Sequence, residues 1–356
     1  MAETRFPDVN PYEDWLKSEG VPVVRGFQID DVYTLELGKW PRMGGAGALI
    51  NIDGGADVIN AYVCEIPPGS ALNPQRHLFE EVIYVLSGSG ATTVWNREGQ
   101  KQTFEWHEGS LFAVPLNASR QHFNGSGLKP ARFLAVTNAP LVINFFRNLE
   151  FVFSNPFIFN DRYSAEKDFW NAQGTHGWIG KRNIWETNFV PDVRSIEVPE
   201  FPTRGKVGRI WLEMALSNLA SHVGEEPAGA YSKAHRHGPG VHILTLAGQG
   251  YTLLWLEGQK RTKLEWKPGS VFSPPNRWFH QHFNTSAVPE RSLRIGFSKR
   301  FRVFEKLMPD RSMMPTTTGG DQIEYEYEDP AIRKEFEQEL AKTGVKSAMP
   351  PLKKGR

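Results

Sequence analysis

The histidines whose spacing suits metal chemistry lie in two short segments of the C-terminal half of the chain. Five of the ten histidines fall within residues 234–242 and 275–284. His235 and His237 are two residues apart, so both imidazoles lie on one face of an extended strand. His280 belongs to the later segment and can approach this pair from another strand. Three neutral imidazoles that leave coordination positions open suit a divalent transition metal such as Fe(II), Mn(II), Zn(II), Ni(II) or Co(II).

Neighbouring side chains are candidates for supporting roles. His282 shares a strand face with His280, and we expect it to support the site through a hydrogen bond or proton transfer. The alternatives are a purely structural role, or His282 as the third ligand in place of His280. His242 is expected to be packed or hydrogen-bonded, but would be an additional ligand if the Gly-Pro-Gly turn before it bent inward. Arg277 and Trp278 enter the second segment, where the arginine could bind a substrate carboxylate or simply face solvent.

The elements that position these residues occur twice, because the chain contains an internal repeat. A shift of 160 residues superimposes glycines, tryptophans and a His-Phe-Asn triplet: Gly88 on Gly248, Gly90 on Gly250, Trp95 on Trp255, Trp106 on Trp266, Gly109 on Gly269 and 122–124 on 282–284. Chance does not keep so many glycines and tryptophans in one register. We therefore expect two copies of one structural unit.

Each copy consists of short β-rich runs separated by turn residues. In the first copy, residues 80–95 hold two such runs joined by Ser-Gly-Ser-Gly, and residues 104–117 hold another that ends at Pro115. The second copy repeats this pattern over residues 241–255 and 264–276. Short strands with glycine-rich turns and no intervening helices favour an all-β sandwich or small barrel over a βαβ fold.

The two histidine segments resemble the two motifs of the cupin superfamily, G-x5-H-x-H-x3–4-E-x6-G and G-x5-P-x-G-x2-H-x3-N. The matching residues of the first motif are Gly229, His235, His237 and Gly248, and those of the second are Gly269, Pro275, His280 and Asn284. A cupin is a small antiparallel β-barrel (a double-stranded β-helix, or jelly roll) with its metal inside. Together with the repeat, the resemblance implies an all-β bicupin with two tandem barrels and short flanking helices.

The second copy departs from the cupin pattern at the glutamate, whose position is taken by Val241. His-Arg-His followed by an apolar residue there, with Trp-x-His-x-His-x-Asn in the second motif, is similar to gentisate 1,2-dioxygenase and related ring-cleavage bicupins. This resemblance implies a mononuclear Fe(II) dioxygenase that opens a hydroxylated aromatic acid, gentisate-like or salicylate-like, with O2. Those enzymes generally carry their metal in the first barrel, whereas the histidines here fall in the second.

Two other functions are compatible with the same histidines. One is a redox-neutral metallo-cupin, a lyase, isomerase or hydrolase in which Mn(II), Zn(II) or Ni(II) polarises a carbonyl or carboxylate group. The other is a binding or storage bicupin without enzymatic activity. The ligand set does not separate a dioxygenase from a redox-neutral enzyme, because the same three histidines serve both.

The first copy lacks most of the predicted ligands. The repeat places Gln75 opposite His235, His77 opposite His237 and Arg120 opposite His280, while Glu81 occupies the expected glutamate position. An arginine at a ligand position repels a metal ion. We therefore expect the first barrel to be structural, or to hold a modified pocket without a tightly bound metal.

Two segments outside the repeat have helical composition. They are residues 11–19 and residues 329–343, the second of which begins with Asp-Pro and is followed by Gly344. The sequence predicts an N-terminal arm (1–55), a first barrel (56–140), an aromatic-rich connector (141–205), a second barrel (206–305) and a C-terminal helix and tail (306–356). The connector is expected to pack against a barrel or a partner subunit.

Composition limits the classes of partner. The formal net charge is +1, from 41 Lys and Arg against 40 Asp and Glu, so nothing attracts the whole chain to nucleic acid or an anionic membrane. The sequence contains no run of 18 or more apolar residues, so it predicts no membrane span. The N-terminus lacks the pattern of a secretion signal. Cys64 is the single cysteine, which excludes an internal disulfide. We expect a cytoplasmic homo-oligomer that binds a small anionic substrate.

Overall fold

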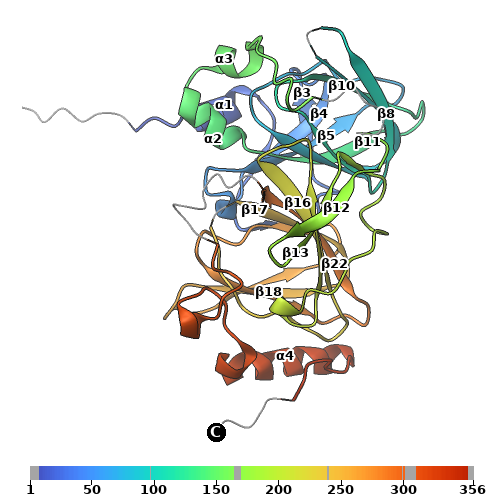
Figure 1. Ribbon diagram of the computed structural model, residues 1–356. Helices are drawn as coiled ribbons and strands as arrows, with labels where there is room; N and C mark the ends of the chain where they lie inside the picture. The colour runs from blue at the N-terminus through green and yellow to red at the C-terminus, as the bar shows by residue number, and fades with distance from the viewer. Residues whose placement is uncertain are drawn as a thin grey trace, which may run out of the picture.

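The computed structural model describes residues 8–96, 98–163, 170–238, 240–298, 300 and 310–351. Within these residues the chain forms two β-barrels, one above the other in Figure 1, with three short helices beside the first barrel and one long helix at the far end of the second. The prediction of an all-β fold with tandem barrels and short flanking helices is confirmed.

The first barrel is built from two sheets that are antiparallel except for one parallel pair of strands. Its strands are β3 (Gly38–Trp40), β4 (Gly45–Ile50), β5 (Asn60–Ile66), β6 (Glu81–Ser87), β7 (Ser89–Trp95), β8 (Lys101–His107), β9 (Leu111–Val114), β10 (Ser119–Asn124) and β11 (Ala131–Thr137). The larger sheet has the order β1-β4-β5-β11-β6-β9-β14, with β3 paired to β4, where β1 is Val23–Val24 and β14 is Phe189–Val190. The parallel pair is β1 with β4. The smaller sheet has the order β10-β7-β8.

The second barrel repeats this arrangement. Its strands are β15 (Gly208–Glu213), β16 (Leu219–Glu226), β17 (Val241–Ala247), β18 (Gly250–Trp255), β19 (Thr262–Trp266), β20 (Val271–Phe272), β21 (Phe279–Asn284) and β22 (Glu290–Phe297). A hairpin of β12 (Thr175–Ile179) and β13 (Arg182–Glu186) extends the larger sheet. Its order is β12-β13-β15-β16-β22-β17-β20-β2, where β2 is Gln28–Ile29. The smaller sheet is β19-β18-β21.

Each larger sheet ends in a strand that comes from outside its own barrel. β2 (Gln28–Ile29), which precedes the first barrel, pairs with β20 of the second. β14 (Phe189–Val190), which precedes the second barrel, pairs with β9 of the first. The segment predicted as an N-terminal arm and the predicted connector are therefore both built into the sheets.

The two barrels share one aliphatic core. Ile50, Val82 and Leu134 of the first barrel belong to the same buried cluster as Leu244 and Leu293 of the second, and β6 packs against β16. Strand alternation explains this, because side chains on one face of each larger sheet point into a barrel and those on the other face point toward the partner barrel.

The helices lie at the outer ends of the molecule. α1 (Pro11–Ser18), α2 (Ala139–Phe146) and α3 (Leu149–Ser154) lie beside the first barrel, and α4 (Pro330–Thr343) covers the end of the second. Asp329 caps α4 by accepting a hydrogen bond from the Ala331 amide at 2.9 Å, and Gly344 ends it in the left-handed conformation. Among the described residues, no helix has both the length and the apolar character needed to cross a membrane.

Candidate metal centre

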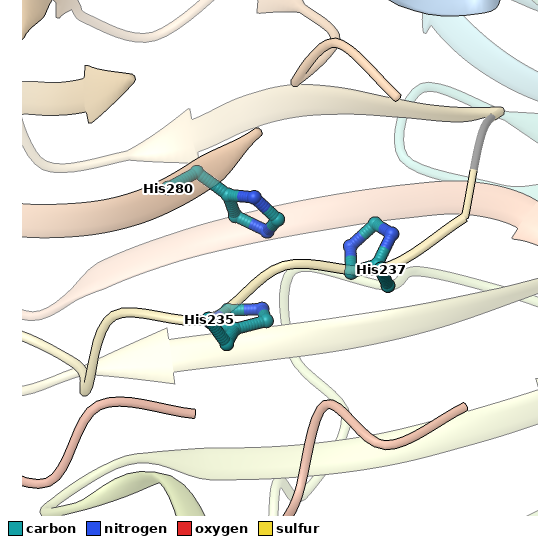
Figure 2. Close-up of side chains that lie close together, drawn as sticks. All are labelled: His235, His237 and His280. Carbon is teal, nitrogen blue, oxygen red and sulfur yellow. The ribbon is translucent and has the colours of Figure 1, made fainter. Parts of the chain in front are cut away.

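His235, His237 and His280 form one cluster inside the second barrel. Each offers a ring nitrogen, and these three atoms lie within 4.8 Å of one another; Figure 2 shows the three rings converging. His235 lies in the extended segment before β17, and its backbone pairs with that of His280 on β21 through hydrogen bonds of 3.0 and 2.8 Å. This antiparallel pairing places the two rings side by side, with centroids 4.2 Å apart.

Backbone carbonyl groups fix the tautomer of all three histidines. The Nδ1 atom of each ring lies within hydrogen-bond distance of a nearby carbonyl oxygen: Lys233 for His235 (3.2 Å), Gly238 for His237 (2.8 Å) and Trp278 for His280 (3.1 Å). A carbonyl oxygen only accepts, so Nδ1 carries the hydrogen and Nε2 presents its lone pair. This is the arrangement in which histidine binds a metal through Nε2.

Burial keeps His235 and His280 neutral. It lowers the pKa of His235 well below its ordinary value, and the nearby positive charge of Arg204 adds to this. The pKa of His280 is also well below its ordinary value, because of burial and then the proximity of His237. A neutral imidazole is the form that coordinates a metal, so the cluster fits a divalent ion.

His282 lies beside the cluster but is held differently. Its ring centroid is 5.6 Å from that of His280, and its Nδ1 lies 2.8 Å from the hydroxyl of Thr252. The indole of Trp266 donates to the same hydroxyl at 3.0 Å. The first barrel repeats this arrangement in His122, Thr92 and Trp106. The hydrogen bond is therefore a feature of the repeat, while in the second barrel His282 also lines the cavity.

The structure does not place His242 with the metal cluster. Val241 and Ile243 line the cavity, so the residue between them on β17 points to the opposite face of the sheet. There its Cε1 atom faces Gly55 of the 3-10 helix η1 (Asp53–Gly55), on the first-barrel side. His242 is buried, and neither ring nitrogen has a hydrogen-bond partner among the described residues. The additional-ligand role proposed for His242 is corrected accordingly.

Arg277 and Trp278 do not line the cavity either. The guanidinium of Arg277 forms two hydrogen bonds with Asp321, at 2.9 and 2.8 Å, and Arg236 donates to the same carboxylate at 2.8 Å. Trp278 contributes its backbone carbonyl, which accepts from His280. The predicted substrate contacts are thus structural contacts, because the C-terminal segment around Asp321 folds back beside the site and takes up the arginine.

The cavity that contains the cluster has a volume of about 260 Å³. Four arginines are among its lining residues: Arg182, Arg204, Arg209 and Arg294. Arg182 forms an ion pair with Asp310 at 2.7 Å, and Arg204 is bound to Ser312 and Gln322. None of these arginines was predicted from the sequence, since they belong to strands and loops outside the two histidine segments.

In the first barrel an arginine occupies the equivalent position. Arg120 contacts His77 and donates to Glu81 at 2.9 Å, and the hydroxyl of Tyr62 donates to the other oxygen of the same carboxylate. Arg120 pairs with Gln75 through the backbone, just as His280 pairs with His235. The guanidinium satisfies the buried carboxylate, so a metal ion here would have to displace it.

Comparisons with known proteins bear on the fold. Residues 62–137 match the family model described as Cupin domain, and no curated protein matches the chain. The oxalate decarboxylase of Bacillus subtilis at pH 4.6 is 15% identical, with 77% of each chain covered and a TM-score of 0.51. Another structure of that enzyme, from a study of its Mn(II) centres, is 15% identical, with 78% of each chain covered and a TM-score of 0.50.

At 15% identity these similarities concern the fold. They do not confirm the resemblance to gentisate 1,2-dioxygenase predicted from the sequence. The family match lies in the first barrel, and the structural match extends over both. The chain is therefore a bicupin by fold, built from two tandem cupin domains.

Proposed function

We propose that this bicupin is a metal-dependent enzyme that acts on a small carboxylic acid without net oxidation, as a lyase. The observation that carries the proposal is the cluster of His235, His237 and His280, whose tautomers direct Nε2 toward a common point in a cavity lined by arginines. Mn(II) is the metal we expect first, since similar solved structures include an enzyme with Mn(II) centres.

His235, His237 and His280 would hold the ion. When bound, a divalent ion acts as a Lewis acid that polarises a carboxylate oxygen of the substrate. Three neutral imidazoles do not reduce its charge, so the site favours an anionic substrate. The buried Arg209 and Arg294 strengthen this preference by adding positive charge to the cavity wall.

We assign proton transfer to His282. Its Nδ1 is engaged by the hydroxyl of Thr252, which leaves Nε2 to exchange a proton with a substrate in the cavity. Burial and the charge of Arg294 hold the pKa of His282 well below its ordinary value. When a substrate carboxylate leaves as carbon dioxide, the electron pair of the broken C–C bond stays on carbon. The proton that completes the reaction would come from solvent through His282, which takes up one proton for each proton that it delivers from Nε2.

A second candidate is the Fe(II) dioxygenase acting on a hydroxylated aromatic acid. The observation that favours it is the lack of a carboxylate in the histidine cluster, within the part of the chain that the structure describes. Val241 replaces the motif's glutamate and lines the cavity. The ligand set is then three neutral histidines, as expected for ring cleavage. O2 consumption separates this candidate from the lyase.

The test is the metal content of protein purified without oxygen. We expect about one Mn(II) per chain in the wild type, loss of that metal in His235→Ala, and retention in His77→Ala, the matched change in the first barrel. Circular dichroism confirms that each variant is folded. Small carboxylic acids are then screened for turnover while O2 is monitored. Stoichiometric iron with O2 uptake would support the dioxygenase, and a metal-free wild type would contradict both candidates.

A further inference from the structure

The inner wall of the second barrel differs in chemistry from that of the first at equivalent positions. The strand registers align β15, β16 and β22 with β4, β5 and β11, and an Arg–Glu ion pair of 2.7 Å recurs in both barrels. Where the first barrel has small or apolar residues, the second has charged ones: Arg209 for Gly47, Glu226 for Ile66, Glu290 for Ala131 and Arg294 for Ala135. The first barrel shows that the fold closes without these charges.

These charged residues are buried and only partly paired. Arg209 donates to Glu226 at 3.1 Å, while the nearest contact between Arg294 and that carboxylate is 3.9 Å. Arg294 is 5% exposed, and its Nη1 has no hydrogen-bond partner among the described residues. A buried charged donor without an acceptor is unfavourable. Arg294, one of the residues that line the cavity, therefore has an unused hydrogen-bond donor.

Gly224 provides the room for this guanidinium. A Cβ atom at this position would overlap Nη1 of Arg294 and lie 2.7 Å from Nη1 of Arg209. The equivalent residue of the first barrel is Cys64, which is buried in that barrel's core. The lack of a Cβ atom at Gly224 therefore leaves the space that the two guanidinium groups occupy.

The arginines and the histidines belong to different sheets of the barrel. Arg209 on β15 and Arg294 on β22 lie in the larger sheet, whereas His280 and His282 on β21 lie in the smaller one. All four line the same cavity. Burial lowers the pKa of Arg294 to about 10, so it stays charged at neutral pH. Burial and the neighbouring Glu226 raise the pKa of Glu290, which lessens the negative charge that opposes the arginines.

We propose that Arg294, supported by Arg209, forms a second anion subsite that binds an acidic group of the substrate other than the group that meets the metal. The substrate is then a small molecule with two acidic groups, such as a dicarboxylate, that spans the two sheets. The contact of one acidic group with the metal rests on the proposed function, whereas the anion subsite at Arg294 does not itself require a metal.

The subsite is tested by calorimetric titration of the full-length protein with malonate and with acetate, first without metal and then with Mn(II). We expect metal-free wild type to bind malonate, and Arg294→Gln to weaken that binding at least tenfold. With Mn(II) bound, malonate should bind at least tenfold more tightly than acetate, and Arg294→Gln should largely remove this difference. Arg291→Gln, on the same strand but paired with Glu225, is the matched control.

Two further measurements keep the outcomes distinct. Gly224→Ala should also weaken malonate binding by displacing Arg294, which provides a test if Arg294→Gln does not fold. Unchanged malonate affinity in a folded variant at either position would overturn the subsite, as would equal affinities of the Mn(II) form for acetate and malonate. Failure of the proposed function would instead appear as missing metal or missing turnover, while malonate still binds the metal-free protein.

Discussion

At the scale of single residues, the partner of Nδ1 distinguishes the histidines. Carbonyl oxygens hold the proton on Nδ1 of His235, His237 and His280, so Nε2 is the nitrogen of each ring that would bind a metal. His282 faces the hydroxyl of Thr252, which both donates and accepts. His282 can therefore carry its proton on either nitrogen, which suits proton transfer better than fixed coordination.

Replacing Thr252 tests this difference. Thr252→Val keeps the shape but removes the hydroxyl, and Thr92→Val makes the same change in the first barrel. Both variants should lose about 1–3 kcal/mol of stability, because a buried indole N–H loses its acceptor. Only Thr252→Val should lower turnover, by about tenfold, with metal content unchanged. Urea denaturation and activity assays measure the two effects, and equal activity of the two variants would contradict the role of His282.

The buried His242 makes stability depend on pH. Burial lowers its pKa to about 3 in the folded protein, against about 6.5 when unfolded. Between about pH 3 and 6.5 this histidine binds a proton in the unfolded chain but not in the folded protein. The contribution of neutral His242 to the free energy of unfolding is therefore complete above about pH 6.5 and is lost as the pH falls. The loss between pH 7.5 and 5.5 is about 1.4 kcal/mol.

Substitution of His242 should reduce that loss. Urea denaturation at pH 7.5 and 5.5 compares the wild type with His242→Leu, and the difference in free energy of unfolding between the two pH values should shrink by about 1.4 kcal/mol. His107→Leu, which replaces an exposed histidine, is the control and should leave the difference unchanged. An identical pH dependence in wild type and His242→Leu would show that this histidine does not stay neutral in the folded state.

At the scale of elements, the C-terminal segment packs against the candidate metal centre. Gln322 pairs with His235 through the backbone, and Asp321 binds both Arg277 and Arg236. Sequence position gives no indication of this, because the segment lies about forty residues beyond the second histidine motif. Arg277, a candidate for substrate binding, instead donates to Asp321, and this contact holds the C-terminal segment beside the candidate metal ligands.

Weakening this attachment should weaken metal binding. Asp321→Asn removes the charge that the two arginines share, and we expect about a tenfold loss of Mn(II) affinity, as is typical when groups that orient metal ligands are altered. Asp329→Asn is the matched control, because Asp329 pairs with Arg261 at an exposed site. Competition with a chelating dye measures the affinities. Equal affinities of the two variants would mean that the segment does not position His235.

At the scale of the whole molecule, the barrels are joined by the shared core and by the exchanged strands β2 and β14. Glu80 adds a polar link, since its carboxylate accepts from the Asn218 amide at 2.9 Å and from Leu219 at 3.2 Å. Neither barrel completes its larger sheet or its core without the other.

This architecture predicts cooperative unfolding. Calorimetry of the metal-free protein should show one transition whose calorimetric and van't Hoff enthalpies agree, and Mn(II) should shift that whole transition upward, because the ion binds only the folded state. Val82→Ala, on the first-barrel side of the shared core, should lower the same single transition by a cavity effect of about 1–3 kcal/mol. Two resolved transitions, only one of them moved by Mn(II), would contradict a common folding unit.

Much of the fold and of the candidate site follows from the sequence by itself. Strand and turn patterns are local, so they predict the repeat, the all-β class and the helices that begin at Pro11 and Pro330. The spacing of His235, His237 and His280 is also a local property once the strands are placed, and the structure brings these three together. The substitution of Arg120 for a ligand histidine is equally visible in the aligned repeat.

The tertiary structure decided the rest, because it depends on which strand faces which. The direction of His242 follows from alternation on β17, counted from residues that line the cavity. The partner of Arg277 is set by a segment that returns from the end of the chain. Arg209 and Arg294 belong to β15 and β22, the first and last strands of the second barrel. Only closure of the barrel places them across from the histidines in one cavity.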